Sequence, residues 1–376
     1  MASNTTAPTL TNMPHHRVVP TAPIPATRLA RRRFGYQVSP WVLFLAFAAA
    51  GCVAKTERDV IVYCALDEEF AAPILNAFER KQDHETGVIA KFDFESTKTV
   101  GLVNQILAEK ASPRCDVFWN NEILHTVRLQ TEGLLQPHDW PVPNDWPSDL
   151  IARDGTWCGF AARARILIIN TKLLPEKEDW PKRVGELADP KWQGNCALAR
   201  PLFGTTATHW AVLRETLGRD EALANLSRIA DNAVIVSGNK QVAQAVSSGR
   251  VAWGLTDTDD AHVEMVMGRD VAIVFPDQAP EDLGTLRIPN TLAILKDAPH
   301  PIAASALVDY LMTPDIEDRL AMGNSSQIPI SRESKFPPAV LPADPVRWMR
   351  VDFEAAAGGW EPWAQDVLAV LDRAGI

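Results

Sequence analysis

The fold class is decided by the stretch Val60-Ile61-Val62-Tyr63-Cys64-Ala65-Leu66-Asp67-Glu68-Glu69. Its first six residues are apolar and rich in β-branched side chains, which is typical of a buried parallel strand. The acidic residues that follow begin a helical pattern over Glu68–Arg80, with one apolar face made by Phe70, Ile74, Leu75 and Phe78. A strand leading directly into an amphipathic helix is the opening unit of an α/β sheet.

The alternation of strands and helices continues along the chain. Lys91–Phe94 is predicted to be the second strand, and Ser96–Thr99 supplies N-cap residues for a helix through Leu102, Ile106 and Leu107. Asp116–Trp119 is predicted to be the third strand. Strands that alternate with helices in this way predict a doubly wound α/β lobe.

A second alternation predicts a second lobe. Its expected strands are Ile166–Asn170, Ala197–Arg200, Ala233–Ser237 and Val251–Thr256, and its expected helices are Thr206–Leu217, Ala222–Ala230 and Lys240–Ser248. Further on come a strand at Thr291–Leu295, a helix at Ile302–Met312 and a helical tail over Asp352–Ala374. We expect residues 59–162 plus 285–330 to form lobe 1. Residues 163–284 plus 331–376 would form lobe 2 and the C-terminal tail.

Residues 1–51 are predicted to be a disordered leader and a lipoprotein signal peptide. They contain five basic residues, no acidic one, and the apolar run Trp41–Ala50. A bilayer-spanning helix needs about 20 apolar residues, so this run fits a signal-peptide core instead. Ala49-Ala50-Gly51-Cys52 resembles the bacterial lipobox, which predicts lipidation of Cys52 and a periplasmic or extracytoplasmic, membrane-anchored protein. An ordinary signal peptide and an uncleaved anchor remain the alternatives.

Net charge and cysteine content limit the classes of partner and the cysteine chemistry that the sequence allows. Removal of the leader changes the formal net charge from -10 to -15, and no nucleic-acid motif is present, which disfavours a DNA or RNA partner. Four cysteines remain besides Cys52, and both two disulfides and buried free thiols are compatible with their wide spacing: Cys64, Cys115, Cys158 and Cys196.

Nothing in the chain matches a common catalytic motif. Gly-x-Ser-x-Gly, Gly-x-Gly-x-x-Gly, the P-loop and His-Glu-x-x-His are all absent from the sequence. We therefore do not expect an enzyme. An exported enzyme that uses paired carboxylates as acid and base stays as the alternative.

Polar sets follow several of the predicted strands. Three of them are acidic: Asp67-Glu68-Glu69, Asn120-Asn121-Glu122 and Asp257-Thr258-Asp259-Asp260. Ligands of open α/β sheets bind at the carboxyl ends of strands, and clustered carboxylates repel one another unless a cation or several donors neutralise them. Acids that merely cap a helix N-terminus are the competing interpretation of Asp257–Asp260.

A second group of polar sets favours an anion. Each set opens a predicted helix, where exposed N–H groups attract negative charge: Ser96-Thr97-Lys98-Thr99, Gly204-Thr205-Thr206 and Ser237-Gly238-Asn239-Lys240. Helix capping alone also explains each set taken singly.

Several of these stretches resemble the periplasmic solute-binding proteins of ABC importers, in particular their ferric-iron-binding class. The similar segments are Val62–Glu69, Cys115–Phe118, Gly159–Arg163, Leu187–Gly194, Ser237–Asn239 and Val251–Asp260. The resemblance spans roughly residues 60–330. It implies a type II-like periplasmic-binding-protein fold, with two lobes of doubly wound mixed sheet, a hinge between them, and closure on a ligand for delivery to a permease and its ATPase.

The departures from that class concern the ligand. Asp67 stands where the class usually has a histidine, the usual carboxylate position falls on Asn121 with Glu122 one residue away, and Asp259-Asp260 replaces a pair of tyrosines. The chain has only three tyrosines, Tyr36, Tyr63 and Tyr310.

We therefore expect a monomeric, oxygen-rich binding protein for a small ligand. The expected metal ligands are Asp67, Glu122, Asp259 and Asp260, for iron, calcium, magnesium or manganese. The remaining expected ligand-binding residues include those for a synergistic anion: Glu68, Thr97, Thr99, Asn121, Thr205, Asn239 and Asp257. A phosphonate or phosphate zwitterion and a polyamine are the alternative ligands.

Overall fold

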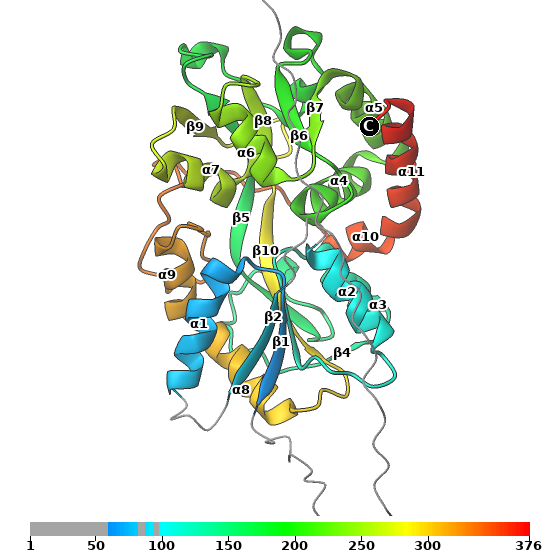
Figure 1. Cartoon of the computed structure of the whole chain (residues 1–376), viewed down its shortest axis with the longest axis vertical. Coiled ribbons are helices and arrows are strands. Elements are labelled where there is room, and N and C mark those ends of the chain that lie inside the picture. Colours follow the sequence, from blue (N-terminus) through cyan, green and yellow to red (C-terminus); the bar gives the residue numbers. More distant parts are fainter. Residues whose placement is uncertain (1–58, 82–86, 93–97) are drawn as a thin grey trace, which may run out of the picture. The chain divides into compact units, whose positions relative to one another are not determined.

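The strand that opens the predicted fold is present at Val60–Cys64 (β1), and the helix Glu68–Lys81 (α1) follows it (Figure 1). The computed structural model describes residues 59–81, 87–92 and 98–376. β1 pairs in parallel with Val88–Phe92 (β2) on one side and with Val117–Asn120 (β3) on the other. Lys98–Ala108 (α2) connects β2 to β3, which confirms the alternation predicted from sequence.

One long strand joins the two lobes. Trp157–Asn170 (β5) is buried along its whole length. Its first half pairs with Arg287–Leu295 (β10), and its second half pairs with Trp253–Asp257 (β8) and Val271–Val274 (β9). The sheet order is β2-β1-β3-β10-β5-β8-β6-β7. Figure 1 shows β5 and β10 passing between the lower and upper lobes.

Lobe 2 repeats the α/β pattern. Cys196–Ala199 (β6) pairs in parallel with β8 and with Val234–Val236 (β7). The helices that connect and cover these strands are Gly204–Leu217 (α4), Arg219–Asn232 (α5), Asn239–Ser247 (α6) and Thr258–Val266 (α7). Since β10 runs antiparallel to β3 in lobe 1 and β5 runs antiparallel to β8 in lobe 2, both lobes contain mixed sheets. The predicted two-lobed α/β fold class is confirmed.

The remaining elements flank these sheets. They are α3 (Leu124–Thr131), β4 (Leu135–Gln136), α8 (Pro301–Leu311), α9 (Pro314–Met322), α10 (Phe353–Gly358), α11 (Trp360–Arg373) and 3-10 turns at Ser148–Leu150, Lys177–Asp179, Val184–Ala188 and Pro190–Trp192. α10 contacts both α3 and α4, and α11 packs against α5. No helix within the described ranges has the length and apolar character needed to cross a bilayer.

The core consists of two hydrophobic clusters. Because side chains alternate across a strand, Val117 and Trp119 of β3 enter one cluster with Phe78, while Phe118 enters the other. The second cluster continues into lobe 2 through residues such as Trp253.

The four described cysteines are buried within these clusters, and no disulfide joins one of them to another. Burial raises the pKa of Cys196 to about 12, and it also raises the pKa of Cys115 and Cys158. Thiols in this state are poor nucleophiles.

Candidate functional site

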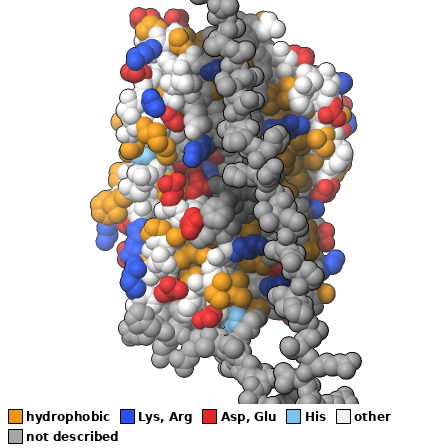
Figure 2. Space-filling model, in the orientation of Figure 1, with side chains coloured by type: hydrophobic (Ala, Val, Ile, Leu, Met, Phe, Trp, Pro, Cys, Tyr) orange, Lys and Arg blue, Asp and Glu red, His pale blue; other side chains and the backbone are white. Residues whose placement is uncertain are grey.

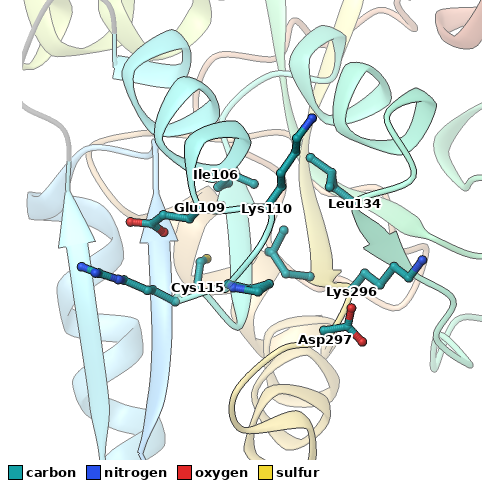
Figure 3. Close-up of a pocket in the computed structure, with 10 residues that line it drawn as sticks. Ile106, Glu109, Lys110, Cys115, Leu134, Lys296 and Asp297 are labelled. Atoms are coloured by element: carbon teal, nitrogen blue, oxygen red, sulfur yellow. The ribbon is translucent and has the colours of Figure 1, made fainter.

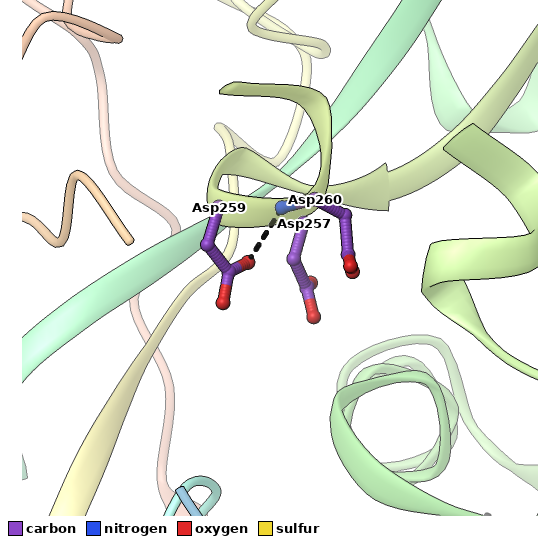
Figure 4. Close-up of side chains that lie close together, drawn as sticks. All are labelled: Asp257, Asp259 and Asp260. Carbon is purple, nitrogen blue, oxygen red and sulfur yellow. Dashed lines mark hydrogen bonds between the residues drawn. The ribbon is translucent and has the colours of Figure 1, made fainter. Parts of the chain in front are cut away.

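The turn from β8 to α7 gathers three carboxylates. Asp257 ends β8, while Asp259 and Asp260 lie in the first turn of α7. Oxygen atoms of the three side chains lie within 4.8 Å of one another. Figure 4 shows the three carboxylates projecting from the turn in the same direction. These three residues belong to one of the acidic sets predicted from sequence.

Asp259 and Asp260 line a cavity of about 550 Å³ that both lobes enclose. Lobe 1 contributes Asp67 at the start of α1, and lobe 2 contributes Lys240 of α6. Five carboxylates and two cationic side chains line this cavity: Asp67, Glu69, Asp259, Asp260, Glu264, Lys240 and Arg269. In Figure 2 acidic side chains gather beside the hollow at mid-height of the visible face. The cavity therefore favours a positively charged solute.

The carboxylates of Asp257, Asp259 and Asp260 form an acidic corner, in which the pKa values of Asp259 and Asp260 are raised. Burial, followed by the charges of Asp259 and Asp257, raises the pKa of Asp260 well above its ordinary value. Burial also raises the pKa of Asp259, although the nearby Arg163 opposes the shift. A raised pKa means that a cation entering this corner competes with protons for these carboxylates.

Two arginines of β5 face the acidic turn. Arg165 Nη1 lies 2.7 Å from Asp257 Oδ1, and Arg163 Nη2 lies 3.4 Å from Asp259 Oδ2. Alternate residues of a strand share a face, which explains why this spacing brings both guanidinium groups to the same turn. Neither arginine was among the site residues predicted from sequence. Two arginines in an otherwise largely apolar strand were the available signal.

Two residues expected to hold an anion lie beside Asp257. Thr205 Oγ1 donates to Asp257 Oδ2 at 2.5 Å, and Asn239 Nδ2 donates to the same oxygen at 2.9 Å. Arg165 extends this network to His209, whose Nδ1 lies 3.4 Å from Arg165 Nε. The structure thus brings Thr205, Asn239 and Asp257 together. The donor groups of Thr205 and Asn239 are already engaged by the Asp257 carboxylate.

Glu122 is buried, and both of its carboxylate oxygens accept hydrogen bonds. One carboxylate oxygen accepts from the backbone N–H of Leu124 at 2.5 Å and from Thr208 Oγ1 at 2.8 Å. The other accepts from Asn120 Nδ2 at 2.9 Å and from the backbone N–H of His125 at 3.1 Å. Burial alone would raise the pKa of Glu122, but His125 and these donors lower it overall. Glu122 therefore links lobe 1 to α4 of lobe 2 and does not line the cavity.

The other predicted residues are dispersed. Glu68 is exposed on α1 and does not line the cavity that Asp67 enters. Thr99 Oγ1 lies 3.1 Å from Asn121 Oδ1, within lobe 1. Thr97 and Cys52 lie outside the described residues.

Neither described tyrosine reaches the cavity. The Tyr63 hydroxyl donates to Glu109 Oε2 at 3.0 Å, and the Tyr310 ring packs on Phe78 with centroids 5.3 Å apart. A tyrosinate metal centre is therefore absent from the part of the chain that the structure describes.

A second hollow lies at the far end of α2. It has a volume of about 40 Å³ and is lined by Cys115, Glu109 and Lys110 among others (Figure 3). A hollow of this size holds a few water molecules at most. The acidic cavity is the candidate site because carboxylates of both lobes line it.

Comparison with known proteins agrees with this geometry. Residues 120–355, well over half of the chain, match the family of bacterial extracellular solute-binding proteins, and the chain belongs to this family. Membership supports a binding role over catalysis and an extracytoplasmic location.

Individual relatives are more distant. Iron uptake protein A1 of Synechocystis sp. is 26% identical over 261 residues, which cover 66% of this chain and 71% of the relative. Iron-bound HitA from Pseudomonas aeruginosa has a similar fold, with a TM-score of 0.70, 22% identity, and coverage of 85% of this chain and 100% of HitA. AfuA from Actinobacillus pleuropneumoniae, with bound fructose-6-phosphate, has a TM-score of 0.67, 19% identity, and coverage of 84% and 97%.

Proposed function

We propose that this protein captures a metal cation, iron in the first place, and delivers it to the permease and ATPase of an ABC importer. The observation that carries the proposal is the acidic corner, where oxygens of Asp257, Asp259 and Asp260 lie within 4.8 Å of one another and where Asp259 and Asp260 line the cavity. Carboxylate oxygens suit hard cations such as Fe³⁺, Mn²⁺, Ca²⁺ and Mg²⁺. The names of Iron uptake protein A1 and iron-bound HitA support iron among these.

The ligand set differs from a tyrosinate centre. Asp259 and Asp260 would bind the cation from lobe 2, and Asp67 would approach it from lobe 1 when the lobes close about β5 and β10. Closure of two lobes around a ligand is the motion that a site shared between them requires. Binding-induced compaction in solution scattering would accompany this closure.

A second candidate solute is organic, either a phosphate-bearing zwitterion or a polyamine. A cavity of about 550 Å³ lies within the usual range for organic ligands, and AfuA carries a sugar phosphate. Lys240 at the cavity wall is the cationic group that would meet a phosphate.

Native mass spectrometry and metal titration of the purified protein test the proposal. We expect one Fe³⁺ per chain, and we expect Asp259→Ala with Asp260→Ala to weaken binding by at least about 100-fold, or about 2.7 kcal/mol. Glu68→Ala is the control, because Glu68 is an exposed carboxylate of α1 that does not line the cavity. An organic mass in place of the metal would support the second candidate, and undiminished metal binding by the double variant would contradict the assigned site.

We also propose that the mature chain is anchored through a lipid on Cys52 and works as a monomer. The lipobox-like sequence Ala49-Ala50-Gly51-Cys52 supports the anchor. A short tether would keep the protein near its permease.

A further inference from the structure

We infer that the carboxylate of Asp257 occupies the anion position of this site, so that a cation binds beside it without an added co-anion. This inference rests on the proposed function. It also implies that phosphate and phosphonate groups are excluded from the N-termini of α4 and α6.

Three donors from three different elements converge on this carboxylate. They are Arg165 Nη1 of β5 at 2.7 Å, Thr205 Oγ1 of α4 at 2.5 Å and Asn239 Nδ2 of α6 at 2.9 Å. A guanidinium group, a hydroxyl and an amide beside two helix N-termini make up an anion-binding set. Asp257 is 2% exposed, so its carboxylate fills that set from inside the protein.

The donors are held in place by each other. Arg165 Nη1 donates to Asn239 Oδ1 at 3.1 Å, Arg165 Nη2 donates to Thr206 Oγ1 at 3.2 Å, and Thr206 Oγ1 donates to Asn239 Oδ1 at 3.0 Å. Arg165 is fully buried, and a buried guanidinium group requires a negative partner. Asp257 is that partner in this structure.

Helix capping does not explain Asp257. It stands at the N-cap position of α7, yet its side chain makes no capping hydrogen bond there. Its carboxylate points instead to the donors on β5, α4 and α6. The residue is therefore assigned to the anion position and not to the stability of α7.

The consequence concerns the neighbouring cation position. A carboxylate of Asp257 within 4.8 Å of those of Asp259 and Asp260 supplies the negative charge that a bound co-anion would otherwise bring. The donors that would bind such a co-anion are already engaged. Metal affinity should thus be independent of phosphate, and Asp257 should determine this property.

The first experiment measures phosphate binding without metal. Inorganic phosphate should not shift the melting temperature of wild-type protein, because its position is filled. Asp257→Ala empties the position, and phosphate should then bind and stabilise the variant. Asp257→Asn keeps the shape and should respond no more than wild type, while Asp270→Ala controls for loss of an exposed carboxylate elsewhere. Phosphate binding to wild type as tight as to Asp257→Ala would overturn the inference.

The second experiment titrates Fe³⁺ and Mn²⁺ with and without excess phosphate, and it needs only wild-type protein if Asp257→Ala fails to fold. We expect wild-type affinities to agree within about twofold, and phosphate to tighten binding by Asp257→Ala by about tenfold. A tenfold gain from phosphate in wild type would overturn the inference. Absence of any metal binding would refute the proposed function, while the metal-free experiment would still decide the role of Asp257.

Discussion

Asp259 and Asp260 are adjacent in sequence, but their side chains have different surroundings. Asp259 lies 3.4 Å from Arg163 and accepts from the backbone N–H of Asp260 at 3.1 Å. Asp260 forms no ion pair within the described part of the chain, and its pKa is raised most by burial and then by Asp259. A partly buried carboxylate without a close counter-charge destabilises the ligand-free protein at neutral pH.

Replacement of Asp260 by asparagine should therefore stabilise the ligand-free protein at pH 7 while it weakens cation binding. The pKa of Asp260 is raised on folding, so its ionisation reduces stability as pH rises from the unfolded value of about 3.9. We expect Asp260→Asn to melt roughly 2–4 °C higher than wild type, a shift equivalent to about 1 kcal/mol. Thermal unfolding followed at intervals of about one pH unit between about pH 4 and pH 8 measures this.

The difference between the two proteins should shrink toward pH 4, where wild-type Asp260 is also neutral. Glu68→Gln, at an exposed position, should leave the melting temperature unchanged. A variant that melts below wild type at pH 7 would contradict the assignment of Asp260 as a carboxylate that destabilises the ligand-free protein and binds the cation.

At the scale of elements, the turn between β3 and α3 joins the two lobes. Glu122 accepts from backbone N–H groups of α3 and from Thr208 of α4, all of them buried. These contacts fix the start of α3 and tie it to α4. The His125 ring nitrogen also lies 3.1 Å from Glu122 Oε1, and this set of protein partners supports a structural role for the carboxylate in this turn.

Glu122→Gln should destabilise the protein and leave cation affinity within a few-fold of wild type. The amide would place its own N–H groups against buried donors, and such a mismatch costs about 1–3 kcal/mol. Because the pKa of Glu122 is lowered on folding, its contribution should be lost as pH falls through that lowered value. Chemical denaturation and metal titration of the same variant measure both effects.

The exposed Glu132, just beyond α3, provides the control Glu132→Gln, which should change neither quantity. Unchanged stability combined with lost metal binding would show that Glu122 is a ligand after all.

At the scale of the whole molecule, two features span both lobes. β5 and β10 connect the sheets, and the C-terminal α10 contacts α3 of lobe 1 and α4 of lobe 2. Arg128 pairs with Glu361 at 2.9 Å, and Arg219 pairs with Asp366 at 2.7 Å. The tail thus binds to the outside of both lobes, away from the acidic cavity residues.

Cys52→Ser should release the protein from the membrane. Serine cannot be acylated at a lipobox, and a protein without its lipid loses its anchor. Fractionation of bacterial cells, followed by detection of the protein in soluble and membrane fractions, measures this. Cys158→Ala removes a buried thiol but keeps Cys52, so this control should remain with the membrane. A Cys52→Ser protein that still sediments with membranes would contradict the anchor.

The candidate site was predictable in part. Asp67, Asp259 and Asp260 follow strands, and residues after parallel strands meet at one edge of a sheet. The same rule could not separate Glu122 from these residues, because a strand-end carboxylate can accept from protein donors or bind a ligand. Arg163 and Arg165 were overlooked because only the apolar second half of β5 was predicted as a strand.

The sequence by itself determined the α/β fold class, the order of most elements, the acidic character of the site and the scarcity of tyrosine. These properties depend on the spacing of apolar residues along short segments and on the amino-acid composition. Only the tertiary structure decided that Asp257 fills an anion position, because its donors Arg165 and Thr205 lie 92 and 52 residues away in sequence. Contacts over such separations depend on how strands pair and helices pack, which no local pattern specifies.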